Sequence, residues 1–367
     1  MAKRTFTRRA ILPKRIRAAA VAALAVLAAA SAAPTAPDRG RAGRSTLDFS
    51  FIDVEGGAAT LIASPAGESL LIDSGFPGGR DAGRIAEVAR EHAGLERIDH
   101  YITTHWHRDH VGGIGELVSL VPVARYYGHR IPEPVPPDIL KAPIGRWQEL
   151  ATDPVWLRAG DRIPLAGQPS AASGTPALAI EVLASDGVVK GEPEGSPQVR
   201  ACERGHEPLS EDTSDNARSL AFHVSYGAFD LFAGGDLTWN VEHKLACPDP
   251  VVPRVDAFLV NHHGLDNSNN PVLIDALAPT VAIVNNGPAK GGEPRTMSDL
   301  LAYLGASRVF QVHRNVREGA INTAAEFIAN EAEDCDAAFI RLSVSPDAKQ
   351  YTVAIPARNR SWTFDAR

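Results

Sequence analysis

The segment ITTHWHRDHVGG, residues 102–113, places three histidines and an aspartate within six positions. His105 and His107 are two residues apart, so their imidazoles point to the same side of an extended segment. Asp109 and His110 follow after the chain has turned. Imidazoles and a carboxylate at this spacing suit a pair of borderline divalent ions such as Zn2+. The alternative is a solvent-exposed, histidine-rich loop, which four ligand-type residues at the end of a strand disfavour.

Two later segments also end an apolar strand in residues that bind metals. FDLFAGGD ends at Asp236, and AFLVNHHG contains His262 and His263. Side chains at strand ends are aimed by a rigid sheet and leave room for a substrate. Asp236 taken alone is equally well explained as a turn residue after two glycines, but beside the histidine cluster we expect it to bridge two ions. Asp73, in LLIDSG, is either an Asx-turn residue or a group that orients a liganding histidine.

The elements that would position these residues are strands that alternate with helices. Three strands joined by Gly-containing turns are predicted within residues 47–75, a helix within 80–94, and a strand at IDHYITT that leads into the histidine cluster. Gly112 and Gly113 would let the backbone pass close to the cluster. Further helices are predicted at residues 114–120, 239–245, 271–277 and 297–304, between further apolar strands. This order predicts an α/β (α+β) fold of two mixed sheets flanked by helices.

The organisation of the chain is expected to be one domain over residues 47–367. Residues 122–215 are dense in Pro, Gly and charge, with candidate strands at 160–165 and 177–185. Such a composition predicts long loops inserted into the sheets, and long ordered loops near a site often form its walls. A separate inserted domain is therefore not expected.

The first 33 residues have the pattern of a cleavable export signal. Seven Lys or Arg and no acid precede the apolar run Ala18–Ala30, which closes in SAAP. This run is too short and too alanine-rich to span a membrane comfortably, although a retained anchor is the alternative. TRRAIL, residues 7–12, is similar to a twin-arginine signal. With a linker at residues 34–46, the pattern predicts export to the periplasm or the extracellular space.

Charge and cysteine content restrict the class of partner. The chain has 37 basic and 44 acidic residues, and without the seven basic residues of the signal the formal charge is about −14. A strongly acidic chain disfavours nucleic acid and favours a small-molecule or surface-linked substrate. Three cysteines at long spacings, Cys202, Cys247 and Cys335, allow at most one disulfide and no cysteine-rich metal site.

The ordered motifs resemble those of a known family. HWHRDH matches the HxHxDH signature of the metallo-β-lactamase superfamily, and IDxG, HxHxDH, GGD and HHG follow one another as they do there. FIDVEGGAATLIASPAGESLLIDSG, NARSLAFHVSYGAFDLFAGGD and VNHHGLDNSN further resemble the branch typified by the extracellular hydrolase domain of competence (DNA-uptake) proteins. The resemblance covers about residues 47–312. It implies a metallo-β-lactamase-like αββα sandwich with two metals at the sheet edges.

The resemblance also implies a ligand set. The implied ligands are His105 and His107 for the first ion, Asp109, His110 and either His263, which is favoured, or His262 for the second, and Asp236 between the two ions. The histidine that usually completes the first ion is missing, so Asp215, Asn216 or a water would replace it, with His206 a weaker candidate. His129 and His313 follow candidate strands and either face the cleft or serve the structure.

Such ligands predict an exported hydrolase that uses a metal-bound hydroxide, which Asp109 would help to orient. The ions are expected to be zinc, with Mn2+ and Fe as alternatives. Phosphodiesters and other esters or lactones are the favoured substrates. Asp236 stands where several lactam-hydrolysing relatives have Cys, which disfavours β-lactams. The alternatives are a redox protein with two irons and a metal-binding protein without catalytic activity.

Overall fold

The computed structural model describes residues 44–165, 176–192 and 207–367. The predicted signal at residues 1–33 and nearly all of the linker at 34–46 lie outside the described residues, as do Cys202 and His206. The export signal therefore stays a prediction. No helix in the described ranges is long and apolar enough to cross a bilayer.

The first sheet contains nine of the described strands, in the order β17-β16-β15-β1-β2-β3-β4-β5-β6. The strands from β3 to β6 are parallel and the others antiparallel, so the sheet is mixed. Its strands are β1 (Leu47–Phe51), β2 (Thr60–Ala63), β3 (Ser69–Ile72), β4 (Ile98–Ile102), β5 (Val123–Gly128), β6 (Val155–Trp156), β15 (Ile340–Val344), β16 (Gln350–Ile355) and β17 (Arg360–Asp365).

The second sheet contains eight described strands, in the order β14-β13-β12-β11-β10-β9-β7-β8. It is also mixed, because β10 to β14 are parallel and β7, β8 and β9 pair antiparallel. Its strands are β7 (Leu178–Ser185), β8 (Val188–Val189), β9 (Ala221–Tyr226), β10 (Phe229–Ala233), β11 (Ala257–Leu259), β12 (Val281–Val284), β13 (Val309–His313) and β14 (Ile328–Asn330).

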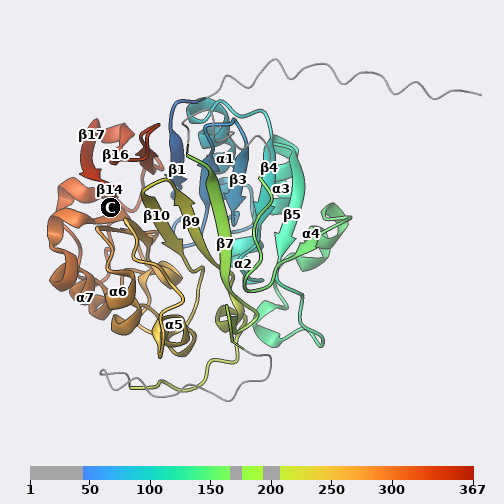
Figure 1. The fold of residues 1–367 in the computed structure, drawn as a ribbon. Coiled ribbons are helices and arrows are strands. Elements are labelled where there is room, and N and C mark those ends of the chain that lie inside the picture. The colour runs from blue at the N-terminus through green and yellow to red at the C-terminus, as the bar shows by residue number, and fades with distance from the viewer. Residues whose placement is uncertain (1–43, 166–175, 193–206) are drawn as a thin grey trace, which may run out of the picture. The chain divides into compact units, whose positions relative to one another are not determined.

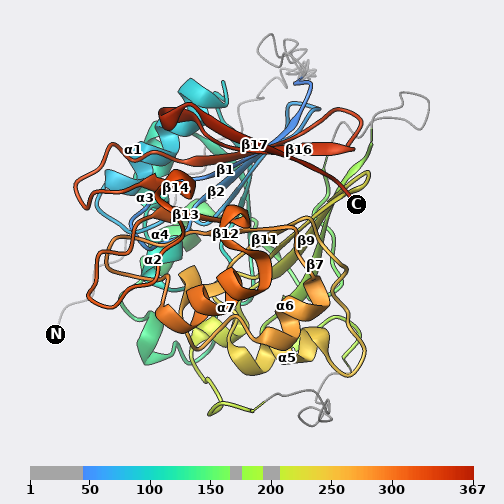
Figure 2. The ribbon, with the colours of Figure 1, turned by 90° about the vertical axis from the view of Figure 1, so that its left-hand side faces the viewer.

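Helices cover the outer faces of the two sheets (Figures 1 and 2). The helices are α1 (Arg80–Glu87), α2 (Arg108–Val111), α3 (Ile114–Leu120), α4 (Ile144–Leu150), α5 (Trp239–Ala246), α6 (Pro271–Leu277) and α7 (Pro294–Leu304). One apolar cluster packs α1, α3 and α4 on the first sheet, and another packs α5, α6 and α7 on the second. A third cluster fills the space between the sheets. The predicted αββα sandwich is confirmed.

The Pro- and Gly-rich segment contributes to both sheets. Within residues 122–215, β5 and β6 form an edge of the first sheet, and β7 and β8 form an edge of the second. The candidate strand at residues 160–165 is wrong, because only an isolated bridge between Arg162 and Glu181 forms there. Asp161 accepts a hydrogen bond from the backbone of Arg158, which closes a turn instead.

Candidate metal centre

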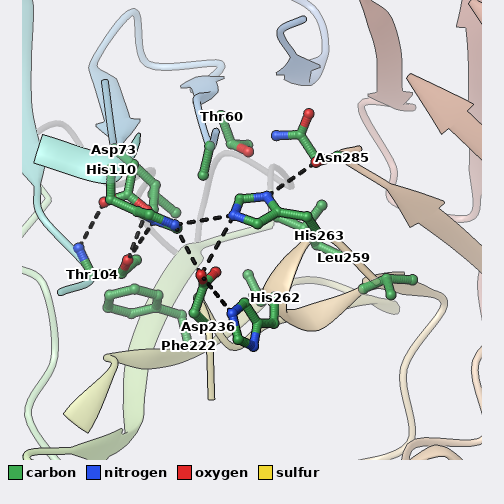
Figure 3. Close-up of a pocket in the computed structure, with 15 residues that line it drawn as sticks. Thr60, Asp73, Thr104, His110, Phe222, Asp236, Leu259, His262, His263 and Asn285 are labelled. Carbon is green, nitrogen blue, oxygen red and sulfur yellow. Dashed lines mark hydrogen bonds and ion pairs between the residues drawn. The ribbon is translucent and has the colours of Figure 1, made fainter. Parts of the chain in front are cut away.

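The site lies where strands from both sheets end. Asp73 follows β3 and the segment 105–110 follows β4, which run parallel in the first sheet. Asp236 follows β10 and the His262-His263 pair follows β11, which run parallel in the second sheet. Carboxyl ends of parallel strands meet at one edge of a sheet, and the two edges face one another here. Figure 3 shows His110, Asp236, His262 and His263 pointing toward a common centre.

The Asp236 carboxylate is the centre of this arrangement. Its Oδ2 atom lies 3.2 Å from His110 Nε2 and 3.4 Å from the Nε2 atoms of His262 and His263. The Nε2 atom of His105 lies 3.8 Å from the same oxygen. One buried carboxylate oxygen therefore faces four imidazoles, which is the position of a bridging ligand between two ions.

Asp109 closes one side of the centre. Its Oδ2 atom lies 3.4 Å from His263 Nε2 and 3.6 Å from His110 Nε2. One ligand atom from each of Asp109, His110, Asp236 and His263 lies within 4.8 Å of all the others. Two imidazoles and two carboxylates at this separation match the donor set of a zinc-type ion.

The imidazoles are held from the rear, so that Nε2 faces the centre. His110 Nδ1 lies 2.8 Å from Asp73 Oδ2, and His263 Nδ1 lies 3.2 Å from the carbonyl of Asn285. His262 Nδ1 lies 3.0 Å from the Ser268 hydroxyl. An acceptor at Nδ1 fixes the tautomer with its lone pair on Nε2, the usual state of a metal-bound histidine.

His105 is held in the same way through a chain of hydroxyl contacts. Thr104 Oγ1 donates to Asp73 Oδ2 at 2.7 Å, so it is left to accept from His105 Nδ1 at 3.1 Å. The Thr104 amide donates to the other Asp73 oxygen at 2.8 Å. Asp73 therefore orients two of the imidazoles without facing the centre itself.

Two pairs of nitrogens show that the residues fit a cation. His110 Nε2 lies 3.2 Å from His263 Nε2, and His105 Nε2 lies 3.0 Å from His107 Nδ1. In the His105–His107 contact the other ring nitrogens are directed at Thr104 and Asp138, so two lone pairs face one another, whereas in the His110–His263 contact the proton that His110 retains lies between the nitrogens. A divalent ion between such nitrogens removes this repulsion, so the donor set fits metal ions.

Asp138 is a site residue that the sequence analysis missed. His107 Nε2 lies 3.1 Å from Asp138 Oδ2, which also accepts from the Asp215 amide at 2.9 Å. Because Nε2 is directed at a carboxylate, the Nδ1 of His107 is the nitrogen left for an ion. Asp138 lies in a short 3-10 turn, Pro137–Ile139, inside the Pro-rich segment. An acidic residue among prolines was the available signal, and it is a weak one.

Burial and neighbouring charges separate the pKa values of two adjacent histidines. Burial, and then the charge of His110, hold the pKa of His105 well below its ordinary value. Burial alone would lower the pKa of His110, but Asp236, Asp73 and Asp109 outweigh it and hold this pKa well above its ordinary value. His105 is therefore ready to bind an ion at neutral pH, whereas His110 must first release a proton.

Both aspartates of the centre are carboxylates at neutral pH. Burial alone would raise the pKa of Asp236, but the surrounding histidines, above all His110, hold it well below its ordinary value. The pKa of Asp109 is held low against burial by His110, His263 and Lys290. The centre thus offers two negative ligands buried in low dielectric, which favours cation binding.

The structure separates the two residues proposed to complete the first ion. Asp215 is buried and accepts from the Trp106 amide at 2.6 Å, so it supports the turn between His105 and His107. Asn216 Nδ2 lies 3.3 Å from His262 Nε2. Burial lowers the pKa of His262 to about 4, so this imidazole is neutral and available at neutral pH. His262 Nε2 therefore faces both the Asp236 carboxylate and the Asn216 amide, whereas Ser268 lies behind the ring.

Backbone strain accompanies three of these residues. Asp73, His262 and His263 have φ values of 61°, 52° and 55°, in the left-handed region that residues with a Cβ rarely adopt. Strain of this kind persists where the surrounding contacts impose it and concentrates at functional sites. Two strained histidines in succession turn both rings toward Asp236.

Lys290 is a second residue of the centre that the sequence does not predict. Its ammonium group forms a short ion pair with Asp109 Oδ2, and it lies 5.6 Å from the centre of the Phe76 ring. It belongs to the loop after β12, between Pro288 and Gly291. A lysine in a Gly-rich loop carries no recognisable pattern, so only the structure brings it to the centre.

The two other histidines that follow predicted strands lie elsewhere. His129 is buried, lies 3.3 Å from Asp215 and contacts the Trp106 ring, so it supports the same turn and is not part of the centre around Asp236. His313 is buried in a different cluster, with Asp53 and Cys335. The site assignments taken from the resemblance are otherwise compatible with these positions and stay predictions.

The chain shows similarity to several known proteins. Residues 52–195 match the metallo-beta-lactamase superfamily. Atrochrysone carboxyl ACP thioesterase of Aspergillus fumigatus is 41% identical over 69 residues, which are 19% of this chain and 21% of that protein. Thioesterase pkgB of Emericella nidulans is 29% identical over 103 residues, 28% of this chain and 28% of that protein. The chain thus spans less than a third of either relative.

Among solved structures, Tm1679, a metal-dependent hydrolase of the beta-lactamase superfamily, aligns with a TM-score of 0.44 and 12% identity. The alignment covers 72% of this chain and 95% of that chain.

Proposed function

We propose that this chain is a zinc-dependent hydrolase of carboxylic esters or thioesters and a member of the metallo-beta-lactamase superfamily, a proposal that the match over residues 52–195 supports. The observation that carries the proposal is the Asp236 carboxylate facing four imidazoles whose Nδ1 atoms are engaged behind them. This arrangement suits two ions and leaves no role for a serine or cysteine nucleophile.

The residues divide into ligands and groups that position them. Divalent ions in this centre supply Lewis acidity and lower the pKa of water toward neutrality. His105, His107 and His262 would hold the first ion, and Asp109, His110 and His263 the second, with Asp236 shared. Asp73 and Asp138 fix the rings, so that the lone pairs are aimed before an ion arrives.

Lys290 supplies a positive group at the rim of the centre. Its side chain is 35% exposed, whereas that of Asp109 is 13% exposed. With Asp109 engaged as a metal ligand, the Lys290 ammonium group would be free to bind a negative group of a substrate or the oxygen that gains charge in the transition state. Hydrolysis then splits the ester C–O or thioester C–S bond and gives a carboxylate and an alcohol or thiol.

The choice of ester or thioester rests on two supports. Both curated relatives are named thioesterases, although the matches cover small parts of them. The chain is also acidic, with a formal charge of −7 that becomes more negative without residues 1–33, which disfavours polyanionic nucleic acid. A phosphodiesterase, which the competence-like motifs would favour, is the alternative that the same assay tests.

The test is a comparison of substrates on zinc-loaded protein. We expect hydrolysis of p-nitrophenyl acetate and of acetyl-coenzyme A, and slower or no hydrolysis of bis(p-nitrophenyl) phosphate and of a chromogenic lactam. His107→Ala should abolish turnover, because it removes a ligand and unpairs Asp138. His92→Ala, on the exposed segment after α1, removes an imidazole outside the centre and is the matched control.

Either of two results would reject the proposal. One is zinc-loaded protein that turns over none of these substrates, which would favour a metal-binding protein without catalysis. The other is full esterase and thioesterase activity in His107→Ala. Faster turnover of the phosphodiester than of either acyl substrate would instead assign the alternative activity.

A further inference from the structure

A second cluster of ligand-type side chains lies in the fold and shares no residue with the centre described above. Asp53 follows β1, His313 ends β13, and Cys335 lies in the segment between β14 and β15. One ligand atom from each lies within 4.8 Å of the other two. A carboxylate, an imidazole and a thiol are three ligand types that zinc accepts.

His313 has one imidazole nitrogen without a hydrogen-bond partner among the described residues. The residue is fully buried, and its Nδ1 donates to the carbonyl of Arg314 at 2.9 Å. The neutral ring then carries a lone pair on Nε2, which is buried and has no hydrogen-bond partner among the described residues. A buried acceptor without a donor is costly. A ring whose Nδ1–H is held by a backbone carbonyl while Nε2 is free has the arrangement of a metal ligand.

Asp53 and Cys335 provide the other two ligands. The Cys335 thiol donates to Asp53 Oδ2 at 3.2 Å, and Asp53 is fully buried. Arg84 lies 3.4 Å from the same oxygen but also bonds to the Asp53 carbonyl and to Glu55, so it keeps partners if an ion takes Oδ2. The thiol proton thus lies between the Cys335 sulfur and the Asp53 carboxylate, in the place where a cation would bind both groups.

A nucleophilic role for Cys335 fits less well. An activated cysteine has a neighbouring base or cation that favours the thiolate. Here burial raises the pKa of the Cys335 thiol to about 11, and the neighbouring Asp53 carboxylate adds to the effect. The hydrogen bond of the thiol goes to the carboxylate and not to His313. An ion bound between the imidazole and the thiol would therefore account both for the lone pair of His313 without a partner and for the position of the Cys335 thiol.

We propose that Asp53, His313 and Cys335 form a separate site for one divalent ion, with zinc preferred. The thiol proton leaves to solvent when the ion binds, so that a thiolate, a carboxylate and a neutral imidazole become the ligands. Thiolate and imidazole ligands favour zinc over Mg2+ and Ca2+. Cys335 is partly exposed, which gives the ion access, and it lies among the acidic residues Glu333, Asp334 and Asp336.

The ion would stabilise a loop that reaches the catalytic centre. Asp53 begins the loop between β1 and β2, and the amide of Ala58 in that loop donates to the Asp109 carbonyl at 3.1 Å. Gly57 also packs against this carbonyl, since a Cβ at Gly57 would lie 2.6 Å from it. The site therefore ties β13 and the segment before β15 to the loop that supports Asp109.

Cobalt substitution tests the site, because a thiolate bound to Co2+ gives a charge-transfer absorption band in the near ultraviolet. The proposed ligands of the catalytic centre include no cysteine, and Cys247 is disulfide-bonded. We expect the band in Co2+-loaded wild type and in His107→Ala. We expect its loss in Cys335→Ser and in His313→Gln, with one fewer equivalent of bound metal in each.

Several outcomes would overturn the site. A wild-type protein saturated with Co2+ that shows no such band contradicts it, and so does a band that persists in Cys335→Ser. Circular dichroism of each variant shows whether loss of the band reflects unfolding. His313→Gln keeps the thiol, so its loss of the band identifies the imidazole as a ligand. The band is independent of esterase activity, so the site and the proposed function can fail separately.

Discussion

Asp73 orients imidazoles of the centre without facing the centre itself. It accepts hydrogen bonds from the Thr104 amide, the Thr104 hydroxyl and His110 Nδ1. Asp73→Asn keeps the left-handed backbone, which Asn tolerates, but replaces one acceptor by a donor. We expect metal affinity to fall about tenfold to a hundredfold. Competition with a chromophoric chelator measures the change.

The matched control is Asp299→Asn on α7, a half-exposed carboxylate in an ion pair with Arg295. It removes the same charge from the chain without touching the centre, so affinity should stay at the wild-type value. Equal affinity for Asp73→Asn and Asp299→Asn would show that Asp73 is an ordinary turn residue.

Glu242, on α5, also acts at the residue scale, by organising the segment that carries the histidine pair. Its Oε1 accepts from Asn261 Nδ2 at 2.6 Å and from the Asn269 amide at 2.8 Å, and its Oε2 accepts from the Asn270 amide at 2.7 Å. Burial raises the pKa of Glu242 from 4.5 to about 7. The folded protein therefore keeps this proton at pH values where the unfolded chain has lost it.

This difference has a defined sign. The contribution of Glu242 to the free energy of unfolding is fully present below pH 4.5 and is lost as the pH rises through 7. Between pH 5 and 8 the free energy of unfolding of wild type should fall by about 2 to 3 kcal/mol more than that of Glu242→Gln, because the glutamine side chain does not titrate. Urea unfolding of both proteins at pH 5 and pH 8 measures this difference in the free energy of unfolding. The other titrating groups contribute equally to the two proteins, so their effect cancels. Parallel pH profiles would contradict the prediction.

At the scale of elements, the turn after the histidine cluster depends on close backbone contact. A Cβ at Gly113 would lie 2.2 Å from the Ser74 carbonyl oxygen, and the Ser74 amide donates to the His110 carbonyl at 2.7 Å. Gly113→Ala should therefore push β3 away from α2 and lower the free energy of unfolding by about 1 to 3 kcal/mol. Urea unfolding measures the loss, and chelator competition should show weaker metal binding.

Gly83 provides the contrast, because it lies within α1 and a Cβ there would meet nothing within 4 Å. Gly83→Ala should be neutral or stabilising by up to about 1 kcal/mol, since alanine favours the helix. If Gly113→Ala and Gly83→Ala shift the unfolding midpoint in the same direction, the prediction is wrong, and the close contact with Ser74 is not the reason for glycine at position 113.

Elements with a strong local pattern could be predicted from the sequence, whereas contacts between distant loops could not. The helix at 114–120 and the strands before His105, Asp236 and His262 have clear apolar periodicity and punctuation. Asp138 has neither, because a single 3-10 turn among prolines has no period. Its role arises only because the chain returns past His107.

The same limit applies to the Asp53, His313 and Cys335 cluster. Each segment contributes one residue to the cluster, and Asp53 and Cys335 are separated by 282 positions. Ligands that occur as HxHxDH reveal a site by spacing. Ligands that come singly from three loops reveal it only when the fold has brought them together.

At the scale of the whole molecule, the candidate metal centre joins the two sheets. His105, His107, Asp109 and His110 extend from the first sheet, whereas Asp236, His262 and His263 extend from the second. Without ions, the interface between the sheets retains the charged carboxylates of Asp109 and Asp236 in low dielectric. Ions bound between residues of both sheets would therefore also stabilise the packing of one sheet on the other.

Removal of metal should consequently lower the thermal stability of the whole chain. Binding to the folded state alone adds about 2.7 kcal/mol at a free zinc concentration 100 times Kd, so restoring zinc to chelator-treated protein should raise Tm by several degrees. Calorimetry of Cys335→Ser isolates the catalytic centre from the proposed second site. In a protein with both Cys335→Ser and Asp236→Ala, zinc should leave the Tm nearly unchanged. If zinc raised the Tm of this double variant as much as that of Cys335→Ser, zinc would stabilise the chain at another place. The rise should shrink as pH falls, because protons compete for the imidazoles.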